Sequence, residues 1–293
     1  MKNELQKLIK KSSNPKIIEE AFKFAEIAYK DKYRLSGENY IKHALRVALM
    51  LEKMGMDEKT IVFGILHDTI DDMPGSTKKK EIQELEKKFG KEIAQLVEKI
   101  SELGRIRYSL AIKIKEKKIL SGEKIENLRK MFLAIAGDLR VILVELLSRL
   151  DGSNFLHYLP EEQQKLYAIE TLHIFVPIAN RLGLNEIRRN LEDISFSYLF
   201  KDKYKWLKEN IQEQYEEREK HLKKFIPKLK KIFKKNRIKV VDINYRAKSY
   251  WSTYKKLVKK GMDFKKVHDL IAIRITVKDI GDCYKTLGII HKQ

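Results

Sequence analysis

The chain has 293 residues, of which 43% are hydrophobic and 35% are charged, a composition typical of folded domains rather than disordered or fibrous proteins. Its length is sufficient for two domains with separate cores. The net charge of +21 favours contact with polyanions such as nucleotides or RNA.

Much of this charge lies in lysine runs of helical periodicity. We interpret it mainly as solvated surface, because base-stacking aromatic residues are not interleaved with the lysines. A single cysteine, Cys283, excludes an intrachain disulfide framework. The sequence shows neither a signal peptide nor a membrane span, which predicts a cytoplasmic protein without membrane contact.

Residues 15–155 predict an all-helical unit. Apolar residues such as Ile41, Ala44, Leu45 and Ala48 recur at three- and four-residue spacing, as on the buried face of a helix. Turn-forming pairs are expected to separate the helices, namely Ser36-Gly37, Met54-Gly55, Pro74-Gly75 and Ser121-Gly122. A further helical pair is predicted over 160–199, broken at Gly183.

A second domain, of α/β type, is predicted from about residue 200. It begins with a long charged helix over 201–235 that Pro227 should kink or restart. The β-branched runs 238–245 and 270–277 predict two strands with a helix between them. Because a two-stranded sheet is marginal by itself, we expect the domain to be incomplete or to take strands from elsewhere. There is no Gly-rich phosphate loop, so side chains must hold any phosphate.

Two histidines and a group of aspartates form the first candidate site. If residues 57–72 are helical, His67 and Asp71 lie one turn apart, as do Asp68 and Asp72, and all four share a broad face. His43 provides a ligand from a third direction. Imidazole and carboxylate suit a divalent ion such as manganese, iron or zinc. Taken alone, the same residues also fit ordinary histidines and capping aspartates at helix ends.

A longer pattern surrounds the Gly64-Ile-Leu-His-Asp-Thr-Ile-Asp-Asp72 segment, with further parts at 33–43, 126–131, 138–143 and 170–183. In order and spacing these segments resemble the RelA/SpoT family of bifunctional guanosine tetraphosphate, or (p)ppGpp, synthetase/hydrolases, and the likeness covers nearly the whole chain from about residue 20. It implies a mainly α fold in three parts. These are an all-helical HD-type metal-dependent phosphohydrolase domain (1–158), a connecting helical pair (159–200), and the N-terminal part of an α/β, nucleotidyltransferase-like synthetase domain (201–293).

The resemblance also implies chemistry for the first domain, which in the family removes the 3′-pyrophosphate of guanosine tetra- or pentaphosphate with a manganese ion. Such an ion polarises a phosphoryl oxygen and acidifies water, and a nearby carboxylate takes the proton. The residue roles implied are metal ligands at His43, His67 and Asp68, an acidic pair that handles the attacking water at Asp71 and Asp72, and a guanine-nucleotide contact at Arg34.

The family's fourth metal ligand, an aspartate within Leu-Ala-Asp-Arg-Leu-His-Asn-Met, is not found at its place. Ser148 stands there, and Gly152 replaces an asparagine that contacts substrate. A neutral hydroxyl is a far weaker ligand for a hard divalent ion than a carboxylate, so we expect a weakened metal site. Asp151, one helical turn onward, is the alternative carboxylate, although it points about 60° away. Asp71 replaces a glutamate and shortens the base by one methylene.

A second candidate site follows from residues 245–256, which resemble the family's synthetase motif apart from Tyr245, which replaces a glycine. The implied roles are phosphate contacts at Arg246, Lys248, Ser252 and Lys256, a magnesium ligand at Asp269 and an adenine-stacking plane at Arg274. Charge neutralisation and positioning of this kind are what pyrophosphoryl transfer requires. Without the resemblance, the same residues fit a basic solvated helix. The family's remaining synthetase residues lie beyond this sequence, so we expect no pyrophosphate transfer by the chain itself.

We therefore predict a protein of (p)ppGpp metabolism, of the stringent-response type, with a degenerate hydrolase site and a truncated GTP diphosphokinase domain. The implied partners are GDP or GTP, guanosine tetra- and pentaphosphate and ATP, with ribosome or tRNA association through further C-terminal regions. Two alternatives stay open at this point: an active manganese-dependent (p)ppGpp 3′-pyrophosphohydrolase, and a non-catalytic nucleotide- or RNA-binding regulator.

Overall fold

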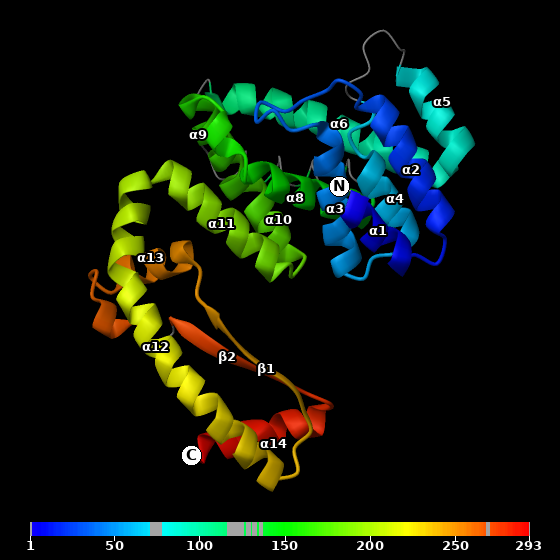
Figure 1. Cartoon of the computed structure of the whole chain (residues 1–293). Helices are drawn as coiled ribbons and strands as arrows, with labels where there is room; N and C mark the ends of the chain where they lie inside the picture. Colours follow the sequence, from blue (N-terminus) through cyan, green and yellow to red (C-terminus); the bar gives the residue numbers. More distant parts are fainter. Residues whose placement is uncertain are drawn as a thin grey trace. The chain divides into compact units, whose positions relative to one another are not determined.

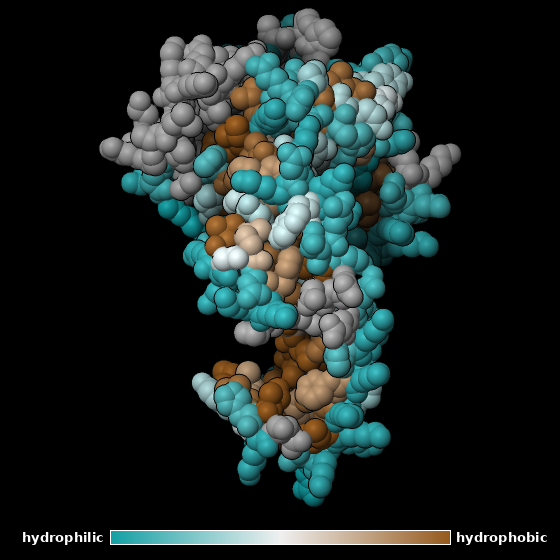
Figure 2. Space-filling view, turned by 90° about the vertical axis from the view of Figure 1, so that its left-hand side faces the viewer, coloured by the Kyte–Doolittle hydropathy of each residue, from teal (hydrophilic) through white to brown (hydrophobic). Residues whose placement is uncertain are grey.

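A computed structural model describes residues 2–70, 78–115, 126, 130, 134, 137–267 and 270–292. The chain divides into two compact units, Met1–Leu199 and Phe200–Gln293 (Figure 1). The predicted mainly α fold is confirmed. Among the described helices, none is long and apolar enough to cross a membrane. Hydrophilic side chains predominate on the face drawn in Figure 2, with hydrophobic ones in separate patches.

The described part of the first unit is helical apart from its turns and one isolated bridge between Tyr33 and Asn39. Its elements are α1 (Lys2–Lys11), α2 (Pro15–Ala28), α3 (Tyr40–Lys53), α4 (Glu58–Leu66), α5 (Lys78–Phe89), α6 (Lys91–Lys115), α8 (Leu139–Ser153), η1 (Leu156–Tyr158), α9 (Glu161–Glu170), the π-helical η2 (Thr171–Phe175), α10 (Val176–Arg181) and α11 (Asn185–Leu199).

Helix α4 lies at the centre of this unit, and every residue from Thr60 to Leu66 is buried. The side chain of Asp57 caps its first turn by accepting a hydrogen bond from the Thr60 amide. A Cβ at Gly64 would collide with Leu51 of α3, so the glycine allows α3 and α4 to approach closely. This approach brings the end of α4 next to the start of α3.

The predicted helix over 57–72 is wrong for residues 67–70, and residues 71 and 72 lie outside the described part of the chain. Helix α4 ends at Leu66, and residues 67–70 form turns. Side chains satisfy carbonyl groups at the end of the helix. The His67 ring donates to Gly64 O at 2.8 Å, and the Thr69 hydroxyl donates to Leu66 O at 2.7 Å. His67 and Asp68 therefore sit on a turn, not on consecutive faces of a continuous helix.

The predicted break at Gly183 is confirmed, with a left-handed φ of 71° at the turn between α10 and α11. Ile174, Phe175 and Leu191 belong to the same hydrophobic core as α2 to α8. The helices between residues 160 and 199 are thus part of the first compact unit.

The second unit consists of α12 (Lys201–Lys235), β1 (Val240–Ala247), α13 (Tyr250–Lys259), η3 (Phe264–Lys266), β2 (Ile271–Val277) and α14 (Ile280–His291). The two predicted strands are confirmed, with the connecting helix between them. They pair antiparallel from Val240 opposite Val277 to Ala247 opposite Ile271. Helix α12 does not restart at Pro227, which lies inside it.

The second unit has hydrophobic residues buried at two levels of its fold. Leu229, Phe233 and Ile238 form one buried cluster, against which Ile273 and Ile275 of β2 are partly buried. Further buried residues are Leu207, Ile211, Leu257, Val267 and Leu270. Within β2, half-buried and exposed residues alternate, which is the pattern of a sheet with one covered face.

Candidate metal centre and nucleotide pocket

Three side chains of the first unit meet at one point. His43 from the first turn of α3, His67 from the end of α4 and the adjacent Asp68 each offer one ligand atom within 4.8 Å of the others. Asp68 Oδ2 lies 3.3 Å from His67 Nε2 and 3.8 Å from His43 Nε2. Both histidines are buried, whereas the Asp68 side chain is 31% exposed. The cluster therefore opens to solvent on the Asp68 side.

The His67 ring is arranged to present a free lone pair. Its Nδ1 donates to the backbone carbonyl of Gly64, so in the neutral ring Nε2 carries the lone pair. That nitrogen is buried and has no hydrogen-bond partner within the described residues. Burial lowers the pKa of His67, but the Asp68 carboxylate, together with the Gly64 carbonyl and Glu145, outweighs burial and raises the pKa. The potential that favours a proton here also favours a cation, so the three residues fit a divalent metal ion.

On the other side of the His43 ring lies Asp151. Its Oδ2 is 2.6 Å from His43 Nδ1, and Arg46 donates to both of its oxygens, at 2.5 Å to Oδ1 and 2.9 Å to Oδ2. Burial raises the pKa of Asp151, but the hydrogen bonds from His43 and Arg46 outweigh it and hold the pKa at about 2. Because Asp151 contacts the nitrogen that points away from Asp68, it does not stand where a fourth metal ligand would.

Ser148 lies on the Nε2 side of the ring instead, with its Oγ 3.1 Å from His43 Nε2. Since the ionised Asp151 can only accept hydrogen bonds, His43 Nδ1 carries the proton, and the Ser148 hydroxyl donates to the lone pair on Nε2. The cluster thus contains one carboxylate, two imidazoles and one neutral hydroxyl.

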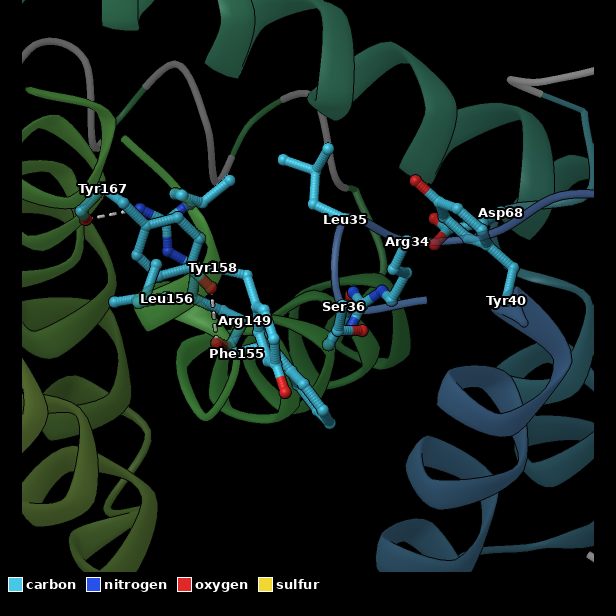
Figure 3. A pocket seen from close by; sticks show the side chains of 13 residues that line it. Arg34, Leu35, Ser36, Tyr40, Asp68, Arg149, Phe155, Leu156, Tyr158 and Tyr167 are labelled. Atoms are coloured by element: carbon cyan, nitrogen blue, oxygen red, sulfur yellow. Dashed lines mark hydrogen bonds between the residues drawn. The ribbon is translucent and has the colours of Figure 1, made fainter. Parts of the chain in front are cut away.

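A cavity of about 390 Å³ adjoins the cluster. In Figure 3, Arg34, Tyr40 and Asp68 lie on one side of it, and Tyr158, Leu156 and Tyr167 lie on the other. The Arg34 guanidinium lies 5.7 Å from the ring centroids of both Tyr40 and Phe155. The cavity thus places a cation held by two aromatic rings beside a metal-binding cluster.

Buried Arg149 lines this cavity, and hydrogen bonds hold its guanidinium in place. It donates to Glu170 Oε2 and to the Tyr167 carbonyl, each at 2.7 Å, and its guanidinium carbon lies 3.4 Å from the centroid of the Tyr167 ring. The Tyr167 hydroxyl donates to the Arg149 carbonyl at 2.6 Å. A Cβ at Gly152 would lie 2.9 Å from this hydroxyl, so Tyr167 fills the space that a side chain at position 152 would need.

Comparison with known proteins agrees with this geometry. Residues 21–185 match the HD domain, and residues 245–293 match the region found in RelA / SpoT proteins. The chain belongs to the RelA/SpoT family of HD-domain proteins. It is 38% identical to a guanosine-3′,5′-bis(diphosphate) 3′-pyrophosphohydrolase of Aquifex aeolicus (strain VF5), over 99% of this chain and 40% of that protein. It is 36% identical to a GTP pyrophosphokinase of Myxococcus xanthus, over 94% of this chain and 35% of that protein. The chain therefore spans about two-fifths or less of the length of these relatives.

Three residues that the RelA/SpoT resemblance implicates, Asp71, Asp72 and Asp269, lie outside the described residues. Arg246 lies opposite Ala272 in the sheet register, and its side chain is likewise outside the description. The roles of these four residues stay predictions.

The other candidates of the RelA/SpoT synthetase motif lie on two elements of the second unit and on the segment between β1 and α13. The Lys248 amide donates to Leu270 O at 2.8 Å, which extends the pairing beyond β1. Ser252 and Lys256 lie one turn apart on α13 and are partly buried, whereas Arg274 is exposed on β2. Their nucleotide-binding roles also stay predictions.

Aromatic residues gather in the second unit in a way that the sequence alone does not indicate. Trp251 of α13 stacks on Phe200 at a centroid distance of 5.8 Å and on Tyr254 at 6.3 Å. Lys203 lies 5.2 Å from the Phe200 ring, and Lys255 lies 5.3 Å from the Trp251 ring. Our premise that aromatic residues are not interleaved with the lysines is wrong for this surface, because Trp251, Tyr254 and Lys255 lie together on α13, and Phe200 and Lys203 join them from the start of α12.

Sequence reasoning missed Arg46, which holds Asp151, and Glu38, which holds Arg46. Arg46 lies three residues after His43 on α3, and this spacing is a signal that both share a helix face. Glu38 accepts two hydrogen bonds from Arg46, at 3.0 and 2.6 Å. Asp151, the other partner of Arg46, is 105 residues away along the chain, so no local pattern connects the two.

Proposed function

We propose that this chain acts in guanosine tetraphosphate metabolism and that its helical unit binds the tetraphosphate at the cluster of His43, His67 and Asp68. The observation that carries this proposal is the Nε2 of His67, which has no hydrogen-bond partner among the described residues and faces an acidic oxygen beside a cavity that Arg34 lines. The names of the relatives, a 3′-pyrophosphohydrolase and a GTP pyrophosphokinase, support the choice of nucleotide.

Each residue of the cluster has a distinct task in this proposal. His43, His67 and Asp68 hold a divalent ion, which we propose to be manganese, and the ion supplies positive charge to a phosphoryl oxygen and acidity to water. Arg34, held between two rings, donates to phosphate oxygens. Asp71 and Asp72 take up the proton of the attacking water, as the family resemblance implies.

We further propose that hydrolysis by this site is weak. The neutral hydroxyl of Ser148 stands beside His43 Nε2, and Asp151 is engaged on the other side of the ring, so Asp68 is the only carboxylate among the described residues of the cluster. A site with one carboxylate binds a hard divalent ion less tightly than a site with two.

For the second unit, we propose binding of ATP and a guanine nucleotide through residues of the synthetase motif, with magnesium at Asp269. The match of residues 245–293 to the RelA / SpoT region supports this assignment. The contacts proposed are at Arg246, Lys248, Ser252, Lys256 and Arg274.

The test is a pair of measurements on the purified chain with guanosine tetraphosphate: nucleotide binding by equilibrium dialysis, and release of pyrophosphate. We expect manganese to tighten binding while pyrophosphate appears slowly or not at all. His67→Gln should abolish the effect of manganese on binding. The matched control is His221→Gln, because His221 is exposed on α12 and should leave binding unchanged.

Binding that is insensitive to manganese, or equally weak in both histidine variants, would refute the proposed site. Rapid pyrophosphate release would show an active hydrolase and refute the proposal of weak turnover. Magnesium measured in parallel decides the choice of ion.

The aromatic and lysine residues around Trp251 favour a second candidate function, the binding of single-stranded RNA, because stacking rings beside cations are the usual platform for it. Trp251→Ala should then weaken binding of an RNA oligonucleotide, and added salt should weaken binding steeply. The same affinity in the variant and in the wild type would exclude this surface.

A further inference from the structure

We infer that Asp151 is a positioning residue that fixes the orientation and the tautomer of His43, so that Nε2 of this ring points its lone pair into the cluster. The inference deepens the proposed metal site and rests on it for its functional meaning. Its structural content is the hydrogen-bonded chain from the partly exposed Glu38 and Arg46 to the buried Asp151 and His43.

The direction of each hydrogen bond follows from the donors present. An ionised carboxylate only accepts, and an arginine only donates. Asp151 Oδ2 therefore receives the proton on His43 Nδ1, and the lone pair of the neutral ring is left on Nε2. In free imidazole the proton moves between the two nitrogens, whereas here one of the two arrangements would set a lone pair of Nδ1 against an anionic oxygen at 2.6 Å.

Asp151 cannot turn away to adopt another role, because both of its oxygens are held. Arg46 donates to Oδ1 and Oδ2, and Glu38 holds the other edge of the same guanidinium. The carboxylate is 4% exposed. Two cations, Arg46 and Arg34, face the two carboxylates of Asp151 and Glu38, so the effect of Asp151 on the cluster comes mainly from orientation and less from added negative charge.

The same arrangement occurs at the neighbouring histidine with a different acceptor. His67 Nδ1 donates to the Gly64 carbonyl at 2.8 Å, and its Nε2 faces Asp68. Both rings thus have Nδ1 bound to an acceptor and Nε2 turned to Asp68. Partners of this kind typically change metal affinity by about 10- to 100-fold when they are removed.

The experiment uses the full chain labelled with ¹⁵N-histidine and records long-range ¹H–¹⁵N correlations without metal, which distinguish the two tautomers of each ring. We expect His43 to be protonated at Nδ1 in the wild type and to shift toward protonation at Nε2 in Asp151→Ala. His67 should be unchanged and serves as the internal reference. Manganese affinity, measured by calorimetry on the same samples, should fall by about 10- to 100-fold.

The control variant is Asp138→Asn, which removes a carboxylate from the N-cap of the same helix without contact to either ring. It should change neither the tautomer nor the affinity. If Asp151→Ala does not fold, the pair Arg46→Met with Asp151→Leu replaces it, since this pair removes the buried carboxylate together with the arginine that donates to it, and Glu38, which loses its partner, is partly exposed. The expectation for the pair is the same.

A folded variant in which His43 keeps its proton on Nδ1, or in which manganese binds as tightly as in the wild type, would overturn the inference. The proposed function fails in a different way. If the wild type binds no manganese while the tautomer still depends on Asp151, the positioning role stands and the metal site does not.

Discussion

Ser148→Asp is the substitution that tests the weakened metal site most directly. Ser148 Oγ lies 3.1 Å from His43 Nε2, so a carboxylate on the same backbone position reaches the cluster without movement of α8. It adds a second negative charge beside Asp68. The variant should therefore respond in opposite directions without and with a divalent ion.

Without metal, the variant should be less stable than the wild type. Two unit charges about 4 Å apart repel by about 4 kcal/mol at an effective dielectric constant of 20. Partial exposure of Asp68 and proton uptake by one carboxylate reduce the net cost to about 2 kcal/mol. For a unit of about 200 residues this corresponds to a fall in Tm of roughly 4–8 °C.

With manganese, the order should reverse. Charge-assisted coordination by a second carboxylate should tighten binding about 100-fold, which is about 2.8 kcal/mol. Manganese at 100 times the Kd of the variant stabilises the folded variant by about 2.7 kcal/mol. This gain is enough to offset the repulsion between the two carboxylates. Release of pyrophosphate from guanosine tetraphosphate should rise in parallel.

The assay is thermal unfolding with and without manganese, followed by calorimetry and pyrophosphate release. Ser148→Asn is the matched control, because it has the same size and no charge, and it should show neither the loss of stability nor the gain in affinity. A folded Ser148→Asp variant whose Tm and manganese affinity equal those of the wild type would refute the reasoning that a carboxylate is lacking here.

Three further predictions concern α8 and its surroundings. Arg149→Met leaves the buried Glu170 carboxylate unmatched and should lower the free energy of unfolding by about 3–5 kcal/mol. Stability should partly recover in a Glu170→Gln background. A urea titration that finds no loss of stability in Arg149→Met would contradict a stabilising role of the Arg149–Glu170 ion pair. Gly152→Ala places a Cβ 2.9 Å from the Tyr167 hydroxyl and should cost about 1–3 kcal/mol. Most of this cost should disappear in a Tyr167→Phe background, and equal costs in both backgrounds would exclude the contact. Asp138→Ala removes the N-cap of α8 and should cost about 1 kcal/mol at neutral pH. Because hydrogen bonds from Arg140 lower the pKa of Asp138 in the folded chain, its contribution is present above the usual value of 3.8 and is lost as the pH falls below it. Denaturation curves of wild type and Asp138→Ala that stay apart in acid would contradict this assignment.

The sequence by itself determined the class of elements and their order. Periodic apolar residues indicated the helices, Gly183 marked a break, and β-branched runs located β1 and β2 to within two residues at their starts. These signals act between residues at most four apart, so they survive without knowledge of the fold. The motif around His67 also selected the three residues that meet in the cluster.

Only the tertiary structure decided what surrounds that cluster. The sequence left Asp151 open as a substitute metal ligand, and it gave no sign that the Tyr167 hydroxyl fills the space at Gly152. His43 and Asp151 are 108 residues apart. The direction of the Asp151 carboxylate is set by the packing of α3 against α8 and by the hydrogen bonds from Arg46. Neither depends on the spacing of residues within one segment of the sequence. A residue's identity fixes which bonds it can make, whereas packing between distant helices fixes which partner it meets.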